Sequence, residues 1–344
     1  MKESKTKTFS GSSLNTLAQT ETTVAIVLGN GSDLSDPKVL QGRAKRKLVT
    51  QKMVLSLIGI TEKAEDSERL KSYWNTFYCQ SNIYTFEGRL YGKYCKNRFC
   101  TLCCSIRKAK IINAYLPIIN QWDEPYFVTL TAKAIKSKNL KRRMKDLNRG
   151  FRKINARYRK RALRGKGPKL IGIKSLECNF NPIKLTYNPH MHVIVASKEM
   201  AEIIIKEWLE ICTPKFAIRK AQHLAKISDK QRALVEVVKY GSKIFTEPGT
   251  KENGIDGSIF TAALDNIFVA MKGCRIFERF GFNLPKNAEI MRSAGRVLNE
   301  FDQWAFDLRQ CDWMNVKNDQ VLSGYIADPN LSHILNNCIN VEIQ

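Results

Sequence analysis

The sequence has no long hydrophobic run, few acidic residues and only four histidines. No stretch approaches 18 consecutive apolar residues, which excludes a membrane-spanning helix. The run Thr23–Leu28 is too short for the core of a signal peptide and has no cleavage site after it. We therefore expect a cytoplasmic protein whose ten cysteines are reduced thiols or metal ligands rather than disulfides.

Acidic residues are outnumbered, because 32 Asp and Glu stand against 57 Lys and Arg and give a formal charge of +25 over 344 residues. Hydrophobic residues still make up 43% of the chain, which is enough apolar material for a core and excludes full disorder. A positive excess of this size indicates a polyanionic partner, most often nucleic acid.

The positive charge is concentrated in residues 133–169, where 17 basic residues stand against one acid, Asp146. Six apolar residues recur there at steps of 4, 3, 4, 3 and 4: Leu140, Met144, Leu147, Phe151, Ile154 and Tyr158. This spacing predicts an amphipathic helix with one buried stripe. A solvated helix face normally alternates Lys with Glu, and the missing acids favour phosphate contact instead. The predicted DNA contacts are Lys141, Arg142, Arg143, Arg149, Arg152 and Arg157.

The order of predicted elements indicates an α+β fold with a mostly antiparallel sheet. Alternating or β-prone residues predict strands at 126–131, 170–180 and 190–196. Helical spacing predicts further helices over 200–212 and 229–245, the second with Asp229 as its N-cap.

Two histidines stand two residues apart in the third predicted strand, as His190-Met191-His192. Alternate residues of a strand share a face and lie roughly 6.6 Å apart, so both imidazoles can reach one metal ion. A catalytic divalent ion also favours a carboxylate, and Glu177 lies beside the histidines if the two strands pair as a hairpin. The alternative is a pair of ordinary surface or core histidines with a glutamate at the sheet edge.

Half of the cysteines fall within 26 residues. The spacing of Cys95, Cys100 and Cys103 is close to that of zinc ligands, and Cys79 supplies a fourth thiolate. The spacing leaves open whether Cys104 replaces Cys103, and the alternative is a group of reduced buried cysteines.

Glu236, Tyr240 and Lys243 fall at i, i+4 and i+7 of the helix predicted after Asp229, which places them on one helical face. A tyrosine flanked by lysine is usually structural. In this order, however, a Thr-Leu-Thr strand, a His-hydrophobic-His strand and Tyr-x-x-Lys resemble the three motifs of HUH endonucleases. More narrowly, they resemble the single-tyrosine rolling-circle replication initiators (Rep proteins) of small bacterial plasmids. The matching segments are Phe127–Thr131, Asn188–Val193 and Lys239–Lys243.

The resemblance implies site-specific nicking and rejoining of plasmid origin DNA that is single-stranded at the nick. It implies that Tyr240 attacks a phosphodiester to give a 5′-phosphotyrosine. Lys243, one helical turn further on, is placed to orient either the phosphate or the metal site. Glu236 lies at the position of a glutamate that activates water in one subgroup of these initiators. The alternative role for Glu236 is an ion pair with a neighbouring lysine. The implied catalytic ion is Mg²⁺ or Mn²⁺ on His190, His192 and Glu177, beside a structural zinc. A host helicase is a possible further partner.

Together these features predict a chain of four segments. They are a flexible N-terminal extension (1–70), a cysteine-rich zinc module (71–112), an HUH endonuclease domain (120–285) and an acidic C-terminal region (286–344). Two other functions stay open: a non-catalytic zinc-containing DNA-binding protein, which has no need of the histidines or the tyrosine, and a single-tyrosine HUH transposase.

Overall fold

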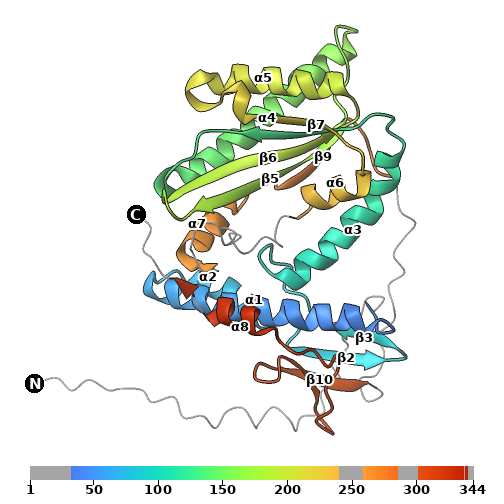
Figure 1. Ribbon diagram of the computed structural model, residues 1–344, viewed down its shortest axis with the longest axis vertical. Helices are drawn as coiled ribbons and strands as arrows, with labels where there is room; N and C mark the ends of the chain where they lie inside the picture. The colour runs from blue at the N-terminus through green and yellow to red at the C-terminus, as the bar shows by residue number, and fades with distance from the viewer. Residues whose placement is uncertain (1–31, 240–258, 286–300, 337, 340–344) are drawn as a thin grey trace, which may run out of the picture.

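The computed structural model describes residues 32–239, 259–285, 301–336 and 338–339 (Figure 1). It has an α+β fold in which antiparallel sheets are flanked by helices, as the sequence predicts. The apolar run Thr23–Leu28 and the predicted site residues Tyr240 and Lys243 lie outside the described residues. None of the described helices is both long and apolar enough to cross a membrane.

A five-stranded antiparallel sheet with the order β7-β4-β6-β5-β9 forms the centre of the fold. Its strands are β4 (Tyr126–Thr131), β5 (Gly172–Asn181), β6 (Thr186–Val195), β7 (His223–Lys226) and β9 (Phe277–Phe280). The three predicted strands are confirmed as β4, β5 and β6. The predicted hairpin is confirmed as well, because β5 and β6 pair with Glu177 opposite His190.

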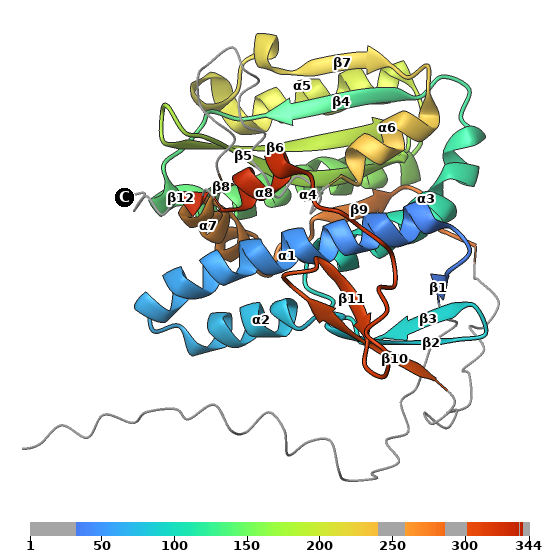
Figure 2. The same ribbon diagram turned by 60° about the horizontal axis from the view of Figure 1, so that its bottom comes forward.

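Helices cover both faces of this central sheet (Figures 1 and 2). One face packs against α4 (Leu140–Leu163), α5 (Lys198–Phe216) and α7 (Thr261–Met271), and the other against α3 (Thr101–Asn120) and α6 (Lys230–Val237). Since side chains alternate along a strand, Met191 and Val193 enter the core under α4 and α5. His190 and His192 therefore face the side that carries α3 and α6, where their neighbour Ile194 packs.

Helix α4 confirms the amphipathic pattern, because all six residues of the predicted stripe are buried. Helix α5 is regular only as far as the predicted end at Cys212. Thr213 then leaves the helical conformation, with φ of +59° and ψ of 157°. The next residue is Pro214, and a proline disfavours helical backbone in the residue before it.

Helix α6 begins as predicted and ends earlier than predicted. The Asp229 side chain caps it by accepting a hydrogen bond from the Arg232 amide at 2.8 Å. The helix ends at Val237, whereas the sequence predicts helix to Phe245. Valines at 235, 237 and 238 lower the helix propensity of this segment, because β-branched side chains lose rotamer freedom in a helix. Glu236 is consequently not joined to Tyr240 by a continuous helix.

A second five-stranded antiparallel sheet has the order β1-β3-β2-β10-β11. Its strands are β1 (Ser32–Asp33), β2 (Asn82–Phe86), β3 (Arg89–Gly92), β10 (Asp302–Asp307) and β11 (Asp312–Asn315). The predicted segments assign these strands to three separate units, whereas the structure joins them by pairing β2 with β10. A short parallel pair, β8 (Ile259–Phe260) and β12 (Cys338–Ile339), adds another contact between distant parts of the chain.

Helix α1 (Pro37–Lys63) lies within the segment for which the sequence predicts a flexible extension, and here that prediction is wrong. The helix is 27 residues long and packs with α2 (Ser67–Phe77) and α8 (Pro329–Asn336) around a separate apolar core. Its basic residues hide this role in the sequence, because Arg43 and Lys47 are themselves buried.

Gly172 provides a direct test of the packing in the central sheet. A Cβ atom at this position would lie 2.3 Å from the Ile194 carbonyl oxygen and 2.6 Å from Cζ of Phe280. We expect Gly172→Ala to lower the free energy of unfolding by about 2–3 kcal/mol, because the strands on both sides must move. Guanidinium unfolding followed by circular dichroism measures this loss. Gly59→Ala is the control, since Gly59 lies in α1 facing open space and alanine is expected to stabilise the helix by about 0.5–1 kcal/mol. Equal stability of the two variants would contradict the close approach at Gly172.

Candidate metal centre

Glu177, His190 and His192, hereafter the His–Glu cluster, meet on the α6 side of the central sheet. The Oε2 atom of Glu177 lies 3.8 Å from Nε2 of His190 and 3.5 Å from Nε2 of His192. One potential ligand atom from each residue lies within 4.8 Å of the others. The predicted proximity of the three side chains is thus confirmed, and their role as metal ligands stays a prediction.

Each imidazole is oriented through its other ring nitrogen. Nδ1 of His190 lies 3.0 Å from the carbonyl oxygen of Asn188, and Nδ1 of His192 lies 3.2 Å from Oγ1 of Thr129. When Nδ1 donates to such an oxygen, the lone pair is on Nε2, the atom that both rings turn toward Glu177. Metal-binding histidines in proteins are commonly held in this way.

The carboxylate of Glu177 is suited to a cation. Its side chain is 5% exposed, and Oε1 is buried without a hydrogen-bond partner among the described residues. Burying a carboxylate oxygen without a partner is costly, and a bound divalent ion would remove that cost. A ligand set of two imidazoles and one carboxylate, completed by further oxygen ligands, would fit Mn²⁺ or Mg²⁺.

The four predicted zinc ligands Cys79, Cys95, Cys100 and Cys103, hereafter the cysteine cluster, also meet, with one Sγ atom from each within 4.8 Å of the others. Sγ of Cys103 lies 3.7 Å from that of Cys79 and 3.6 Å from that of Cys95. Zn–S bonds of about 2.3 Å in a tetrahedron place the sulfurs roughly 3.8 Å apart, so the spacing fits zinc. Cys104 is not in the group, because its Sγ lies 2.8 Å from the carbonyl oxygen of Arg98.

Mutual hydrogen bonds change the pKa values of the thiols of the cysteine cluster in opposite directions. They lower the pKa of Cys95 and of Cys103, in both cases first of all through Cys100, and they raise the pKa of Cys100, first of all through Cys103. The buried ammonium of Lys47 donates to the Cys79 carbonyl oxygen at 2.9 Å. Burial lowers the pKa of Lys47 to about 8, and the negative charge of the nearby thiolates opposes this effect. Lys47 is therefore placed to offset the negative charge of four thiolates around one zinc ion.

Glu236 forms an ion pair with Lys239. The side chain of Glu236 is 33% exposed and that of Lys239 is 37% exposed. This ion pair is the alternative to a role of Glu236 in activating water, and that catalytic role stays a prediction.

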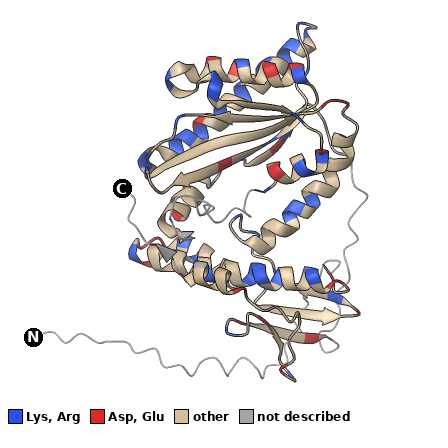
Figure 3. Cartoon of the chain, viewed as in Figure 1, with Lys and Arg blue, Asp and Glu red and all other residues tan. Residues whose placement is uncertain are grey.

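The basic face of α4 lies on the opposite side of the central sheet from the His–Glu cluster (Figure 3). Of the six predicted DNA contacts, five are exposed along the helix: Lys141, Arg142, Arg149, Arg152 and Arg157. Arg143 stacks 5.0 Å from the ring centroid of Phe216, and Arg157 is paired with the buried Glu207. The structure does not bring these six residues to the His–Glu cluster.

Several supporting residues could not be assigned from the sequence. Asn188 and Thr129 lie in the segments matched to motifs, but only the strand register shows that they contact the histidines. Lys47 lies 32 residues before Cys79, in a basic segment that gives no sign of a buried ammonium.

An antiparallel sheet that carries a His-hydrophobic-His strand, beside a cysteine cluster, is the architecture expected of a replication initiator. Comparison with known proteins agrees. The family model described as "Replication protein" (Rep_1) matches residues 89–281, more than half of the chain, and the chain belongs to this family. The plasmid replication initiators that the motifs resemble are thereby confirmed as its relatives.

Curated relatives support the same assignment. A protein named "Protein rep" from Staphylococcus aureus is 29% identical over 219 residues, which cover 58% of this chain and 90% of that protein. "Protein rep" from a Bacillus species is 28% identical over 218 residues, covering 55% of this chain and 69% of that protein. A third, from Bacillus amyloliquefaciens, is 29% identical over 216 residues, covering 54% and 62%. No solved structure matches the chain.

Proposed function

We propose that this replication initiator nicks one strand of plasmid origin DNA and rejoins it, in a metal-dependent reaction that passes through a 5′-phosphotyrosine. The observation that carries the proposal is the His–Glu cluster, which gathers two imidazoles and a buried carboxylate on one sheet face. Helix α6 packs on the same face through Leu234 and Val237, and it ends three residues before Tyr240.

Tyr240 is the proposed nucleophile, on the strength of the resemblance to the single-tyrosine initiators. Its phenolic oxygen forms a bond to phosphorus while the bond from phosphorus to the 3′-oxygen breaks, and the phenolic proton ends on the released 3′-hydroxyl. Tyrosine has an ordinary pKa of about 10, so the reaction needs stabilisation of negative charge at neutral pH. The covalent intermediate preserves the phosphodiester energy, so the reverse reaction rejoins the strand.

The His–Glu cluster would hold Mg²⁺ or Mn²⁺, and such an ion would polarise a non-bridging oxygen of the scissile phosphate. The protein's own contribution is orientation: Asn188 and Thr129 fix the two rings, and strand pairing fixes Glu177 opposite His190. In this proposal Lys243 orients the phosphate, and Glu236 activates water for the terminating cleavage once it leaves Lys239.

The proposed structural role of zinc rests on the cysteine cluster, whose sulfur spacing matches tetrahedral coordination. The proposed substrate is origin DNA that is unpaired at the nick, consistent with the charge of +25. A non-catalytic DNA-binding protein would explain the charge and the cysteines but not the buried His–Glu cluster.

Glu177→Gln tests the metal dependence. Glutamine keeps the shape of the side chain and removes its negative charge, so we expect a folded protein that nicks supercoiled origin plasmid about 100-fold more slowly. The Mn²⁺ concentration for half-maximal nicking should rise as well. The assay is a titration of Mn²⁺ or Mg²⁺ followed by separation of nicked from supercoiled plasmid.

The matched control is Glu207→Gln, which alters another buried glutamate on the opposite side of the central sheet. This variant should keep the metal dependence of the wild-type protein. Wild-type nicking that needs no divalent ion, or an unchanged Mn²⁺ requirement in Glu177→Gln, would overturn the proposed role of the His–Glu cluster.

A further inference from the structure

A basic cavity of about 480 Å³ lies between the segment of the cysteine cluster and strands β5 and β9 of the central sheet. Five cationic residues line it: Lys96, Arg98, Arg107, Lys108 and Arg275. No acidic side chain is among its lining residues in the described part of the chain. Since like charges repel at close range, this arrangement calls for an anionic ligand.

Ser175 forms part of the wall of the basic cavity. It is 1% exposed, and its hydroxyl has no hydrogen-bond partner among the described residues. A buried hydroxyl without a partner is costly, so a ligand that accepts a hydrogen bond here would be stabilised.

Strand register connects the basic cavity to the His–Glu cluster. Ser175 pairs with His192 on one side and with Phe277 on the other. Neighbouring strands lie about 4.8 Å apart, so the Ser175 wall of the cavity begins one strand away from His192. The basic cavity is therefore a neighbour of the His–Glu cluster on the same face of the central sheet.

Two of the cations are fixed in place by the surrounding backbone. Arg98 donates to the Cys274 carbonyl oxygen at 2.7 Å, and Arg107 donates to the Lys96 carbonyl oxygen at 3.0 Å. Burial, followed by the charge of nearby Lys239, lowers the pKa of Lys108, and the charge of Glu236 opposes this effect. The cations are thus held close together, and an anion would relieve both effects.

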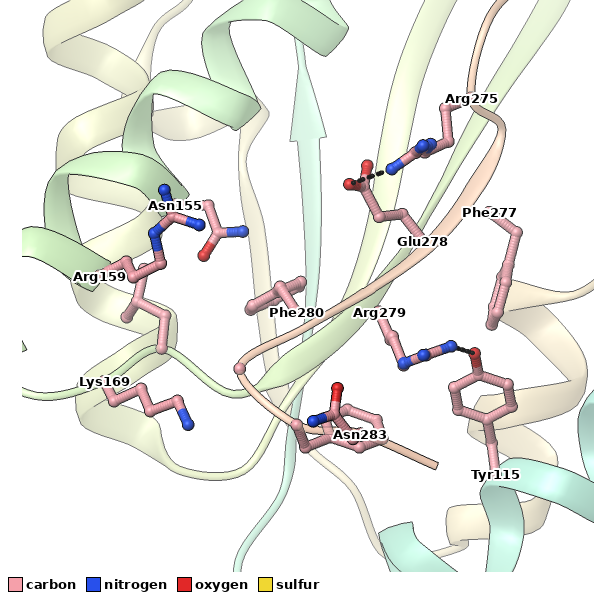
Figure 4. A pocket seen from close by; sticks show the side chains of 13 residues that line it. Tyr115, Asn155, Arg159, Lys169, Arg275, Phe277, Glu278, Arg279, Phe280 and Asn283 are labelled. Carbon is pink, nitrogen blue, oxygen red and sulfur yellow. Dashed lines mark hydrogen bonds and ion pairs between the residues drawn. The ribbon is translucent and has the colours of Figure 1, made fainter. Parts of the chain in front are cut away.

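A second cavity, of about 520 Å³, continues past Arg275 and Phe277, which line both cavities. Figure 4 shows Arg159 and Lys169 on one side of this second cavity and Arg279 on the other. Its one acidic lining residue, Glu278, is already paired with Arg275 at 3.3 Å and Lys174 at 3.5 Å. The two cavities share Arg275 and Phe277, and together they gather cations from the segment of the cysteine cluster, from β9 and from the end of α4 at this edge of the central sheet.

We propose that the basic cavity binds backbone phosphates of the single DNA strand that passes from the His–Glu cluster toward the β9 edge. The proposal rests on the proposed DNA substrate and extends it to a particular surface. Several cations gathered at one edge of the sheet suit the phosphates of a DNA backbone, and phosphate contacts position a strand rather than read its sequence. In this proposal the DNA strand also reaches the basic end of α4, although α4 packs on the face of the central sheet opposite to the His–Glu cluster.

The test is binding of a fluorescent single-stranded origin oligonucleotide by the full-length protein, without added divalent ions or chelator. Lys108→Gln/Arg275→Gln should raise Kd about tenfold and reduce the slope of log K against log salt by about 1.4, the value for two lost phosphate contacts. Lys198→Gln/Lys206→Gln is the charge-matched control on α5 and should change Kd less than about twofold. Equal losses in both double variants would overturn the proposal, because they would reflect net charge alone.

A measurement on the wild-type protein removes any dependence on folding of the variants. The oligonucleotide should protect Lys96 and Lys108 from acetylation, read by mass spectrometry, and should leave Lys206 reactive. Polyglutamate of the same charge should not protect them. Protection by polyglutamate, or none by the oligonucleotide, would overturn the subsite. Neither experiment requires nicking, so the two proposals can fail separately. If the wild-type protein nicks DNA but the lysines are not protected, only the subsite is rejected. If the lysines are protected but the protein does not nick, only the proposed reaction is rejected.

Discussion

Tyr240→Phe is expected to abolish both nicking of supercoiled origin plasmid and the covalent protein–DNA adduct. The substitution removes one oxygen atom, the proposed nucleophile, and leaves the His–Glu cluster unchanged. Loss of a nucleophile that forms a covalent intermediate should lower the rate by at least about 10³-fold. Denaturing gels of 5′-end-labelled and 3′-end-labelled origin fragments measure the adduct and show which DNA end carries it.

Tyr78→Phe is the control for this prediction, because Tyr78 is an exposed tyrosine in the segment after α2 and is 61% exposed. It should nick and form the adduct as the wild type does. Oligonucleotide binding by Tyr240→Phe should also be preserved, which would separate a lost reaction from lost recognition. An adduct that persists in Tyr240→Phe would place the nucleophile on another residue.

The strands that form the His–Glu cluster could be predicted because their signals are local. Alternation over Tyr126–Thr131 and the histidines at 190 and 192 each depend on a few consecutive residues. Glu177 could be placed because a hairpin fixes which residues face each other, and the structure pairs Glu177 with His190.

The position of α4 relative to the His–Glu cluster could not be predicted in the same way. The spacing of its apolar residues shows that one stripe is buried, but the same stripe would pack equally well on either face of a sheet. The outcome depends on Met191 and Val193, which project toward α4 while His190 and His192 project away.

The packing of the N-terminal and C-terminal segments could not be predicted, for a related reason. Lys47 and Arg43 read as solvent-exposed charges, yet they are buried against the Cys79 carbonyl oxygen and the Gln80 side chain. Pairing of β2 with β10 joins residues more than 200 positions apart, and neither strand carries a pattern that specifies its partner. The sequence predicts a helix through Tyr240, but α6 ends at Val237 with Val238 as its C-cap. The low helix propensity of the valines there outweighed the helical spacing of the apolar residues.

Cys100→Ser is expected to remove one equivalent of zinc and to lower the melting temperature by about 10 °C. Cys100 is fully buried in the cysteine cluster, and three sulfurs with a hydroxyl bind zinc far less tightly than four thiolates. Zinc content by atomic emission and thermal unfolding by circular dichroism measure the two effects. Cys104→Ser is the matched control. Cys104 directly follows Cys103 in the sequence, but its thiol lies against the Arg98 carbonyl oxygen, which a serine hydroxyl can also reach.

The loss should spread beyond the cysteine cluster, because this cluster connects the two sheets. Cys79 and Cys95 flank the β2–β3 hairpin of the second sheet, while Cys100 and Cys103 begin α3, which packs on the central sheet. Lys47 of α1 adds a third attachment through the Cys79 carbonyl oxygen. Without zinc, Lys47 would remain buried beside sulfurs that no longer keep their negative charge, so α1 should loosen as well. Hydrogen exchange in Cys100→Ser should therefore rise in α1 and at the start of α3 and stay low in the β5–β6 hairpin. Full zinc occupancy in Cys100→Ser, or exchange confined to residues 95–103, would contradict this connecting role.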